Sequence, residues 1–164
     1  MAGSVGSAGA CSGVSRVSDL MSPNPVSVTE EVLVQTVLDM MALRRIRHVL
    51  VVDGDKRLVG LVTRGDLTHP RSAQERSEEP AFHGPIGQVM KRQVATVDAS
   101  CCSAEAARYM FRTKRGCLPV LDAERRPVGI LTEADFLREF MRAGPGCGCT
   151  VQEDDWPRPS RLPG

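Results

Sequence analysis

Residues 60–66, Gly-Leu-Val-Thr-Arg-Gly-Asp, return as residues 129–135, Gly-Ile-Leu-Thr-Glu-Ala-Asp, an offset of 69 positions (129 minus 60). The same offset places Met21 on Met90 and extends through the chain between them without a gap. Two copies of this length are too few and too long for a solenoid, which stacks several short repeats. The sequence therefore predicts a duplicated small domain.

Composition excludes several classes of function. The chain has 164 residues, 21 Lys+Arg against 20 Asp+Glu, and only 4% aromatic residues. A net charge of +1 and so few stacking side chains argue against a nucleic-acid partner. No apolar run approaches the length of a membrane span, and the N-terminus lacks the pattern of a secretory signal. We therefore expect a cytoplasmic protein whose six cysteines are small apolar residues or free thiols rather than a disulfide framework.

Each copy shows the pattern strand, helix, strand, strand, helix. In the first copy, residues 25–28 predict a short strand and residues 30–44 a helix, because its apolar residues recur at helical spacing. Two apolar, β-branched runs follow, residues 48–52 and 58–62, joined by the turn signal Asp-Gly-Asp-Lys. The predicted fold class is mixed α/β (α+β).

The last helix of the second copy is predicted from Thr132 to about Met141, with Phe136, Leu137, Phe140 and Met141 facing inward. The corresponding helix of the first copy is cut short by a proline at position 70. The predicted limits are residues 17–68 for the first repeat and 86–142 for the second. Residues 69–85 are then a polar linker. Both ends of the chain, residues 1–16 and 143–164, are rich in Gly with Ala and Ser or Pro and are expected to be disordered.

The repeated Thr-x-x-Asp lies where a buried strand ends and a helix begins. Backbone N–H groups at such a junction favour an anion, and Asp66 or Asp135 could accept hydrogen bonds from ribose hydroxyls. The alternative is a capping box, in which the threonine and the aspartate satisfy each other's backbone donors. Both interpretations remain open from the residues alone.

A basic cluster precedes the central strand of the first copy. This basic cluster lies before or at the start of the strand and consists of Arg44, Arg45, Arg47 and His48. Arg64 follows the next strand, so Arg47 and Arg64 could converge on one phosphate. The alternative is a solvated helix end, where cations are favourable. The second copy has Gly116, Cys117 and Glu133 at the positions of Arg47, His48 and Arg64, so its pocket should hold fewer phosphates.

Catalysis has little support in the sequence. The three histidines have no acid or nucleophile at a recognisable spacing. Cys147 and Cys149 could bind a soft metal or react as thiols, but they lie in a Gly- and Pro-rich tail without a third ligand. We expect no enzyme, no metal and no cofactor.

In this order, the motifs resemble a tandem pair of CBS domains, the regulatory modules named after cystathionine beta-synthase. The resemblance covers about residues 17–142 and rests on Asp19-Leu-Met21, residues 25–28, residues 45–53, residues 58–63 and Asp66, with the second copy in register. It implies two βαββα units packed about a pseudo-twofold axis, often dimerising into a disc. It also implies two clefts between the units for adenosine-containing ligands.

The resemblance carries roles over by position. Thr63 with Asp66, and Thr132 with Asp135, would hold ribose, while Arg47 and Gly116 fall where phosphate is contacted. The adenine would be held at four positions: Val26, Ala95, His48 and Cys117. One departure is Leu50, where the family usually has a proline that the second copy keeps as Pro119.

These expectations combine into a non-enzymatic sensor that binds an adenine nucleotide (AMP, ADP or ATP, with AMP favoured), with S-adenosylmethionine as a possible ligand. The protein would form a homodimer and regulate a partner that the sequence does not name. One alternative is a dimerisation or protein-interaction module with vestigial clefts. Another is a thiol enzyme that uses Cys147 and Cys149.

Overall fold

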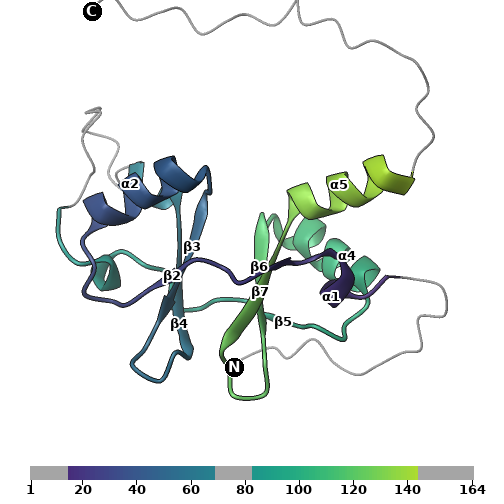
Figure 1. The fold of residues 1–164 in the computed structure, drawn as a ribbon, viewed down its shortest axis with the longest axis horizontal. Coiled ribbons are helices and arrows are strands. Elements are labelled where there is room, and N and C mark those ends of the chain that lie inside the picture. Colours follow the sequence, from purple (N-terminus) through teal and green to yellow (C-terminus); the bar gives the residue numbers. More distant parts are fainter. Residues whose placement is uncertain (1–14, 69–82, 144–164) are drawn as a thin grey trace, which may run out of the picture.

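The computed structural model describes residues 15–68 and 83–143 (Figure 1). Most of the expected terminal segments and linker lies outside these ranges, as do Cys147 and Cys149. Residues 15–16 and 83–85 are described. Arg16 forms a β-bridge with Cys102, and Pro85 forms one with Leu33.

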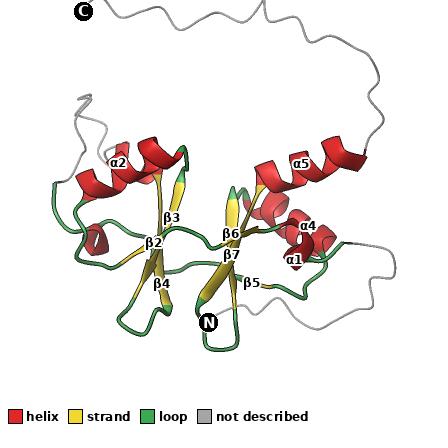
Figure 2. Ribbon diagram, in the orientation of Figure 1, coloured by secondary structure: helices red, strands yellow, loops and turns green. Residues whose placement is uncertain are grey.

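Each repeat has the predicted order of elements (Figure 2). The first contains β2 (Ser27–Val28), α2 (Val34–Arg44), β3 (His48–Val52), β4 (Leu58–Thr63) and α3 (Arg64–Thr68). The second contains β5 (Val97–Asp98), α4 (Ser103–Thr113), β6 (Cys117–Leu121), β7 (Pro127–Thr132) and α5 (Glu133–Ala143). Preceding these are α1 (Val17–Leu20) and β1 (Ser22–Pro23) in the first half, and the 3-10 helix η1 (Ile86–Gln88) in the second. The mixed α/β fold class is confirmed.

The strands of each repeat pair into one sheet, as the alternation of apolar runs and turn signals predicts. In the first, β2 pairs in parallel with β3, and β3 pairs antiparallel with β4. Asp53 stabilises the turn between β3 and β4, because its Oδ1 accepts the backbone N–H groups of Asp55 and Arg57. The second repeat has the same arrangement plus β1, giving the order β1-β7-β6-β5.

Helix α2 begins at Val34, four residues later than the sequence predicts. Leu33 is extended, and the Val34 N–H donates to the carbonyl of Gly84 at 3.1 Å. The residues before α2 are thus tied to the segment that leads into the second repeat, and this pairing competes with the first helical turn. The helix ends at Arg44, and its C-cap residue Arg45 adopts a left-handed conformation with φ of 54°.

The segment before each repeat packs on the sheet of the other repeat. Met21 covers Gly129 and Met90 covers Gly60, and in each case a side chain on the glycine would overlap the methionine. The backbone follows the same exchange, because β1 pairs with β7 and Lys91 bridges to Leu61. Reciprocal contacts of this kind are the mark of a twofold relation, here between two halves of one chain.

Three apolar clusters form the core. One lies in each repeat, and each includes residues of the exchanged segment: Ile86 and Met90 in the first, Val17 in the second. The third combines Leu50 of the first repeat with Cys117 of the second. This last cluster joins the two sheets, so the repeats share one core.

The inward orientation predicted for the last helix is wrong for three of its four apolar residues. Phe136 packs on the core of the second repeat. Leu137, Phe140 and Met141 are 64%, 76% and 74% exposed. The reason is that α5 contacts α1 and β7 on one side only. The helix leads away from the sheets, so its other side is left uncovered by the described residues (Figure 1). Periodicity identifies an apolar helix face but not what covers it.

Within the described residues, no helix is both long and apolar enough to cross a membrane.

Candidate functional site

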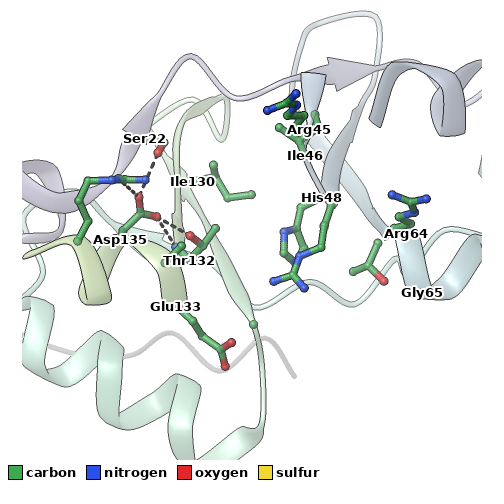
Figure 3. Close-up of a pocket in the computed structure, with 15 residues that line it drawn as sticks. Ser22, Arg45, Ile46, His48, Arg64, Gly65, Ile130, Thr132, Glu133 and Asp135 are labelled. Atoms are coloured by element: carbon green, nitrogen blue, oxygen red, sulfur yellow. Dashed lines mark hydrogen bonds and ion pairs between the residues drawn. The ribbon is translucent and has the colours of Figure 1, made fainter. Parts of the chain in front are cut away.

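A cavity of about 550 Å³ lies between the two repeats (Figure 3). Its lining comes from the ends of the central strands and the starts of the following helices in both repeats. Figure 3 shows Thr132 and Asp135 on one side of the cavity and His48 and Arg64 on the other. This volume is in the range of small-ligand sites.

Seven of the residues predicted for binding line this cavity: Arg47, His48, Thr63, Arg64, Gly116, Thr132 and Asp135. The other four do not line it. Asp66 lies directly behind Thr63, to which it is hydrogen bonded. Val26 and Ala95 pack against the cores of the first and second repeat, and Cys117 is buried in the shared cluster.

The first-repeat wall of the cavity is cationic. Its charged residues are Arg45, Arg47 and Arg64. The Arg64 N–H donates to the Arg47 carbonyl at 2.9 Å, which fixes the two residues side by side at one end of β3 and β4. Among the described residues, none of these three guanidinium groups has an ion-pair partner. The wall therefore presents exposed positive charge suited to an anionic group.

The second-repeat wall has a different charge. Glu133 N–H donates to the Gly116 carbonyl, in the same arrangement as Arg64 and Arg47. This pair thus places a carboxylate and a bare glycine where the first repeat has two arginines. Arg138 also lines this wall, but its guanidinium is held by Asp135 at 2.8 Å. An anion is therefore attracted by the first repeat and repelled by Glu133 in the second.

The Thr-x-x-Asp motifs form caps at the helix starts. Oδ2 of Asp66 accepts the hydroxyl of Thr63 at 2.7 Å and its N–H at 3.2 Å, and the Asp66 N–H donates back to the threonine hydroxyl. Oδ2 of Asp135 accepts the N–H and hydroxyl of Thr132, both at 2.7 Å. The capping box is thus confirmed at Thr63 and Asp66, where both reciprocal bonds form. At Thr132 the structure shows the half in which Asp135 accepts the threonine N–H.

The second oxygen of each carboxylate is held across the repeats. Oδ1 of Asp66 binds Nζ of Lys91 at 2.7 Å, and Oδ1 of Asp135 accepts the hydroxyl of Ser22 at 3.1 Å. Lys91 and Ser22 are equivalent positions of the repeat, each in the exchanged segment. Asp135 additionally binds Arg138. Each motif is therefore completed by the other half of the chain.

One half-buried and one buried group have shifted pKa values. Burial alone would raise the pKa of Asp66, but the hydrogen bonds from Lys91 and Thr63 outweigh it, so the pKa lies below its ordinary 3.8. Burial raises the pKa of the Cys117 thiol to about 11. Asp66 is thus ionised and Cys117 protonated at neutral pH, and Cys117 serves as a small apolar residue there.

His48 faces the cavity and is kept neutral. Burial, and then the neighbouring Arg47, lower its pKa below the ordinary 6.5, while Glu133 and Asp66 oppose the shift. The folded protein then binds this proton more weakly than the unfolded chain does, so the free energy of unfolding should fall as the pH drops through 6.5. A phosphate bound nearby would raise the pKa again.

We expect the urea midpoint of unfolding to decrease as the pH is lowered from about 7.5 to about 5.5. Replacement of His48 by glutamine should reduce this pH dependence. An NMR titration of the His48 ring should give a pKa below the ordinary 6.5. An equal pH dependence in the His48→Gln variant would contradict the assignment.

Sequence reasoning missed several lining residues. Arg138 had a usable signal, because it lies three positions after Asp135 on one helix and can reach its carboxylate. Ser22 had none, since only the exchange of segments brings it to Asp135. The sequence singles out Arg45 and Glu133 by their charge but does not assign them to binding, and it gives no role to the remaining lining residues, which are Ile46, Gly65, Ile130 and Ala134. In the described residues, no group of His, Cys, Asp and Glu could hold a metal ion.

The family model described as "CBS domain" matches residues 17–70 and 86–142. The chain belongs to the CBS domain family. Its two CBS repeats are the halves that exchange their leading segments, and the cavity lies between them. A CBS domain-containing protein from Dictyostelium discoideum is 30% identical over 128 residues, which cover 74% of this chain and 88% of that protein.

Solved structures share the CBS-pair fold. CBSX2 of Arabidopsis thaliana, solved in complex with AMP, has a TM-score of 0.68 and 26% identity, covering 77% of this chain and 96% of that one. The CBS domain pair of MJ0100, solved with 5-methylthioadenosine and S-adenosyl-L-methionine, has a TM-score of 0.66 and 25% identity over 79% of this chain and 98% of that one.

Some relatives are longer enzymes that contain the matched region as a small part. It makes up 23% of a homoserine O-acetyltransferase of Methanohalobium evestigatum and 24% of an inosine-5'-monophosphate dehydrogenase of Nitrosopumilus maritimus. The CBS pair thus occurs both in proteins of about this size and beside catalytic domains.

Proposed function

We propose that this CBS pair is a non-enzymatic regulatory module that binds an adenosine-containing nucleotide, AMP in preference to ATP, in the cavity between its repeats. The observation that carries the proposal is the group of three arginines at one wall, none with an ion-pair partner among the described residues. AMP and S-adenosylmethionine in related CBS pairs support the adenosine moiety.

The preference for AMP rests on the charge of the cavity. Arg47 and Arg64 lie together and suit one phosphate, whereas Glu133 lines the opposite wall. A triphosphate would bring further negative charge towards this carboxylate in a partly desolvated space, where like charges repel strongly. S-adenosylmethionine has no phosphate for the arginines and should bind more weakly than AMP.

Calorimetric titration of the full chain tests this proposal. AMP, ADP, ATP and S-adenosylmethionine are compared with adenosine, which lacks the phosphate. We expect AMP to bind tightest and adenosine at least about tenfold more weakly, because a hydrogen bond to a charged group contributes about 1.5–3 kcal/mol. Absence of binding by all five compounds would refute the proposal.

The proposed regulation is a shift between two arrangements of the repeats. A nucleotide that contacts both walls of the cavity favours the arrangement that brings them together. Such a change could reach a partner through the shared core around Leu50 and Cys117. The thiols of Cys101 and Cys117 fit the reducing cytoplasm as the compartment.

The alternative function, a dimerisation or protein-interaction module, is favoured by one surface. The α5 patch, formed by Leu137, Phe140 and Met141, is an apolar helix face that is largely exposed. A second copy would cover it, since an isologous contact is the commonest in homo-oligomers. Both functions are compatible, because a homodimer could also respond to nucleotide.

We expect the chain to be a homodimer by light scattering after gel filtration, and a Leu137→Glu/Phe140→Glu variant to be a monomer, because two buried charges oppose association. Leu43→Glu is the matched control, since Leu43 is 85% exposed on α2, outside the patch. A dimer that survives the double substitution would show that α5 is not the interface. Dimerisation without any nucleotide binding would favour the alternative function.

A further inference from the structure

The first-repeat wall of the cavity has features that suit a peptide as well as a nucleotide. Arg45, Arg47 and Arg64 are exposed, and none has an ion-pair partner in the part of the chain that the structure describes. Ile46 of the first repeat and Ile130 of the second line the same cavity (Figure 3). An occupant with several carboxylates and one flat apolar ring would satisfy both the arginines and the isoleucines.

The chain itself supplies such an occupant, outside the described residues. Residues 153–156 are Glu-Asp-Asp-Trp, consecutive carboxylates followed by the single tryptophan of the protein. We call these four residues the acidic segment. The sequence holds no cation between Arg142 and the acidic segment, and the next one is Arg158. Its carboxylates therefore form one block of negative charge, complementary to the arginines of the first-repeat wall.

The acidic segment is within reach of the cavity. Helix α5 begins at Glu133, which lines the cavity, and ends at Ala143. Its 11 residues make it about 16 Å long, so its last residue lies about that far from the cavity. Residues 144–152 connect α5 to the acidic segment, and extended chain of this length spans up to about 30 Å. The connection is therefore long enough to return along α5 to the first-repeat wall.

We propose that the acidic segment docks in the cavity between the repeats of its own chain, with its carboxylates on the arginines and the ring of Trp156 against Ile46 and Ile130. Because the segment is tethered, its effective concentration at the cavity is on the order of millimolar, and weak contacts suffice to keep it there. A nucleotide then binds only the chains whose cavity is free, and its apparent affinity falls accordingly. The docking requires only the cavity, whereas the competition with a nucleotide rests on the proposed function.

Trp156 makes the docking measurable without a nucleotide. We expect its emission in the full chain to be shifted to the blue. Its quenching by acrylamide should be at least about twofold weaker than in Arg47→Glu/Arg64→Glu, where like charges expel the acidic segment. Arg44→Glu/Arg112→Glu is the matched control, since it makes the same change of charge outside the cavity and should keep the tryptophan protected.

Two results of the fluorescence experiment would overturn the inference. Equal quenching in the unchanged chain and in Arg47→Glu/Arg64→Glu would show that Trp156 does not lie against the arginines. Protection that is lost on dilution would assign the cavity to the acidic segment of a second copy rather than to that of the same chain.

Neutralising the acidic segment tests the competition. In Glu153→Gln/Asp154→Asn/Asp155→Asn, calorimetry should show AMP binding at least about threefold tighter than in the unchanged chain. The control removes the same charge between the repeats, by replacing Glu75, Glu78 and Glu79 with glutamine, and should change the affinity by less than about twofold. AMP added to the unchanged chain should also raise the quenching of Trp156.

These outcomes separate the inference from the proposed function. AMP binding with equal affinity in the unchanged chain and the neutralised variant, or an equal gain in the control, would overturn the inference and leave the proposed function intact. A protected Trp156 in a chain that binds no AMP would refute the proposed function and support the docking.

Discussion

Replacement of Arg47 by glutamate should weaken AMP binding by at least about a hundredfold, because it removes a cation from the phosphate and puts a like charge in its place. The effect should be large because Arg47 has no ion-pair partner among the described residues that could share it, and Arg64 is fixed beside it. Calorimetric titration with AMP measures this loss directly.

The matched control is Arg44→Glu. Arg44 is the last residue of α2, three positions before Arg47, and takes the same change of charge, but it does not line the cavity. We expect its AMP affinity to change only a few-fold, through screened long-range charge. Adenosine should bind the Arg47 variant almost as well as the unchanged chain. If Arg44→Glu weakens AMP binding as much as Arg47→Glu does, the loss of affinity comes from net charge, and the arginine wall is not the phosphate site.

Replacement of Asp135 by alanine should lower the free energy of unfolding by about 2–4 kcal/mol, because the cap of α5 and a buried acceptor are lost together. The variant leaves the N–H of Thr132 without its acceptor and removes the bond to Ser22 that ties the repeats. For a chain of this size, the expected fall in Tm is roughly 5–15 °C. Urea unfolding and thermal melting at neutral pH measure it.

Glu139→Ala is the control for the Asp135 variant. Glu139 lies on the same helix and forms an ion pair with Arg142 that is largely exposed to solvent. Removing such a pair changes stability by only about 0–1 kcal/mol. If the Asp135→Ala protein has the same Tm as the control variant, the buried hydrogen bonds do not hold the repeats together.

The order of elements was predictable from the sequence because each half shows the same alternation of apolar runs and turn signals. Residues 48–52 and 58–62 are continuous apolar runs on either side of a turn, and they form β3 and most of β4. The start of α2 was not predictable, because the pairing of Leu33 with Pro85 is a contact between distant segments. Periodicity cannot reveal such a contact.

The candidate site shows the same division. Arg47 was predicted because strand ends that follow one another in a hairpin lie together in space. Thr63 and Thr132 were predicted because the repeated Thr-x-x-Asp marks a junction of strand and helix. The partners of the two aspartates were not, since Lys91 and Ser22 come from the opposite half of the chain. The α5 patch was misassigned to the core for a related reason: an apolar face looks the same whether its own chain or another covers it.

The sequence by itself determined the duplication, the βαββα order and the charge difference between Arg64 and Glu133. These are local patterns, repeated at one offset, so they need no knowledge of distant contacts. Only the tertiary structure decided that the segments of Met21 and Met90 exchange and that both strand ends line one cavity. It also decided that Lys91 binds Asp66 and that Ser22 binds Asp135. Each of these depends on side chains meeting across the pseudo-twofold relation, and that packing is a property of the folded chain.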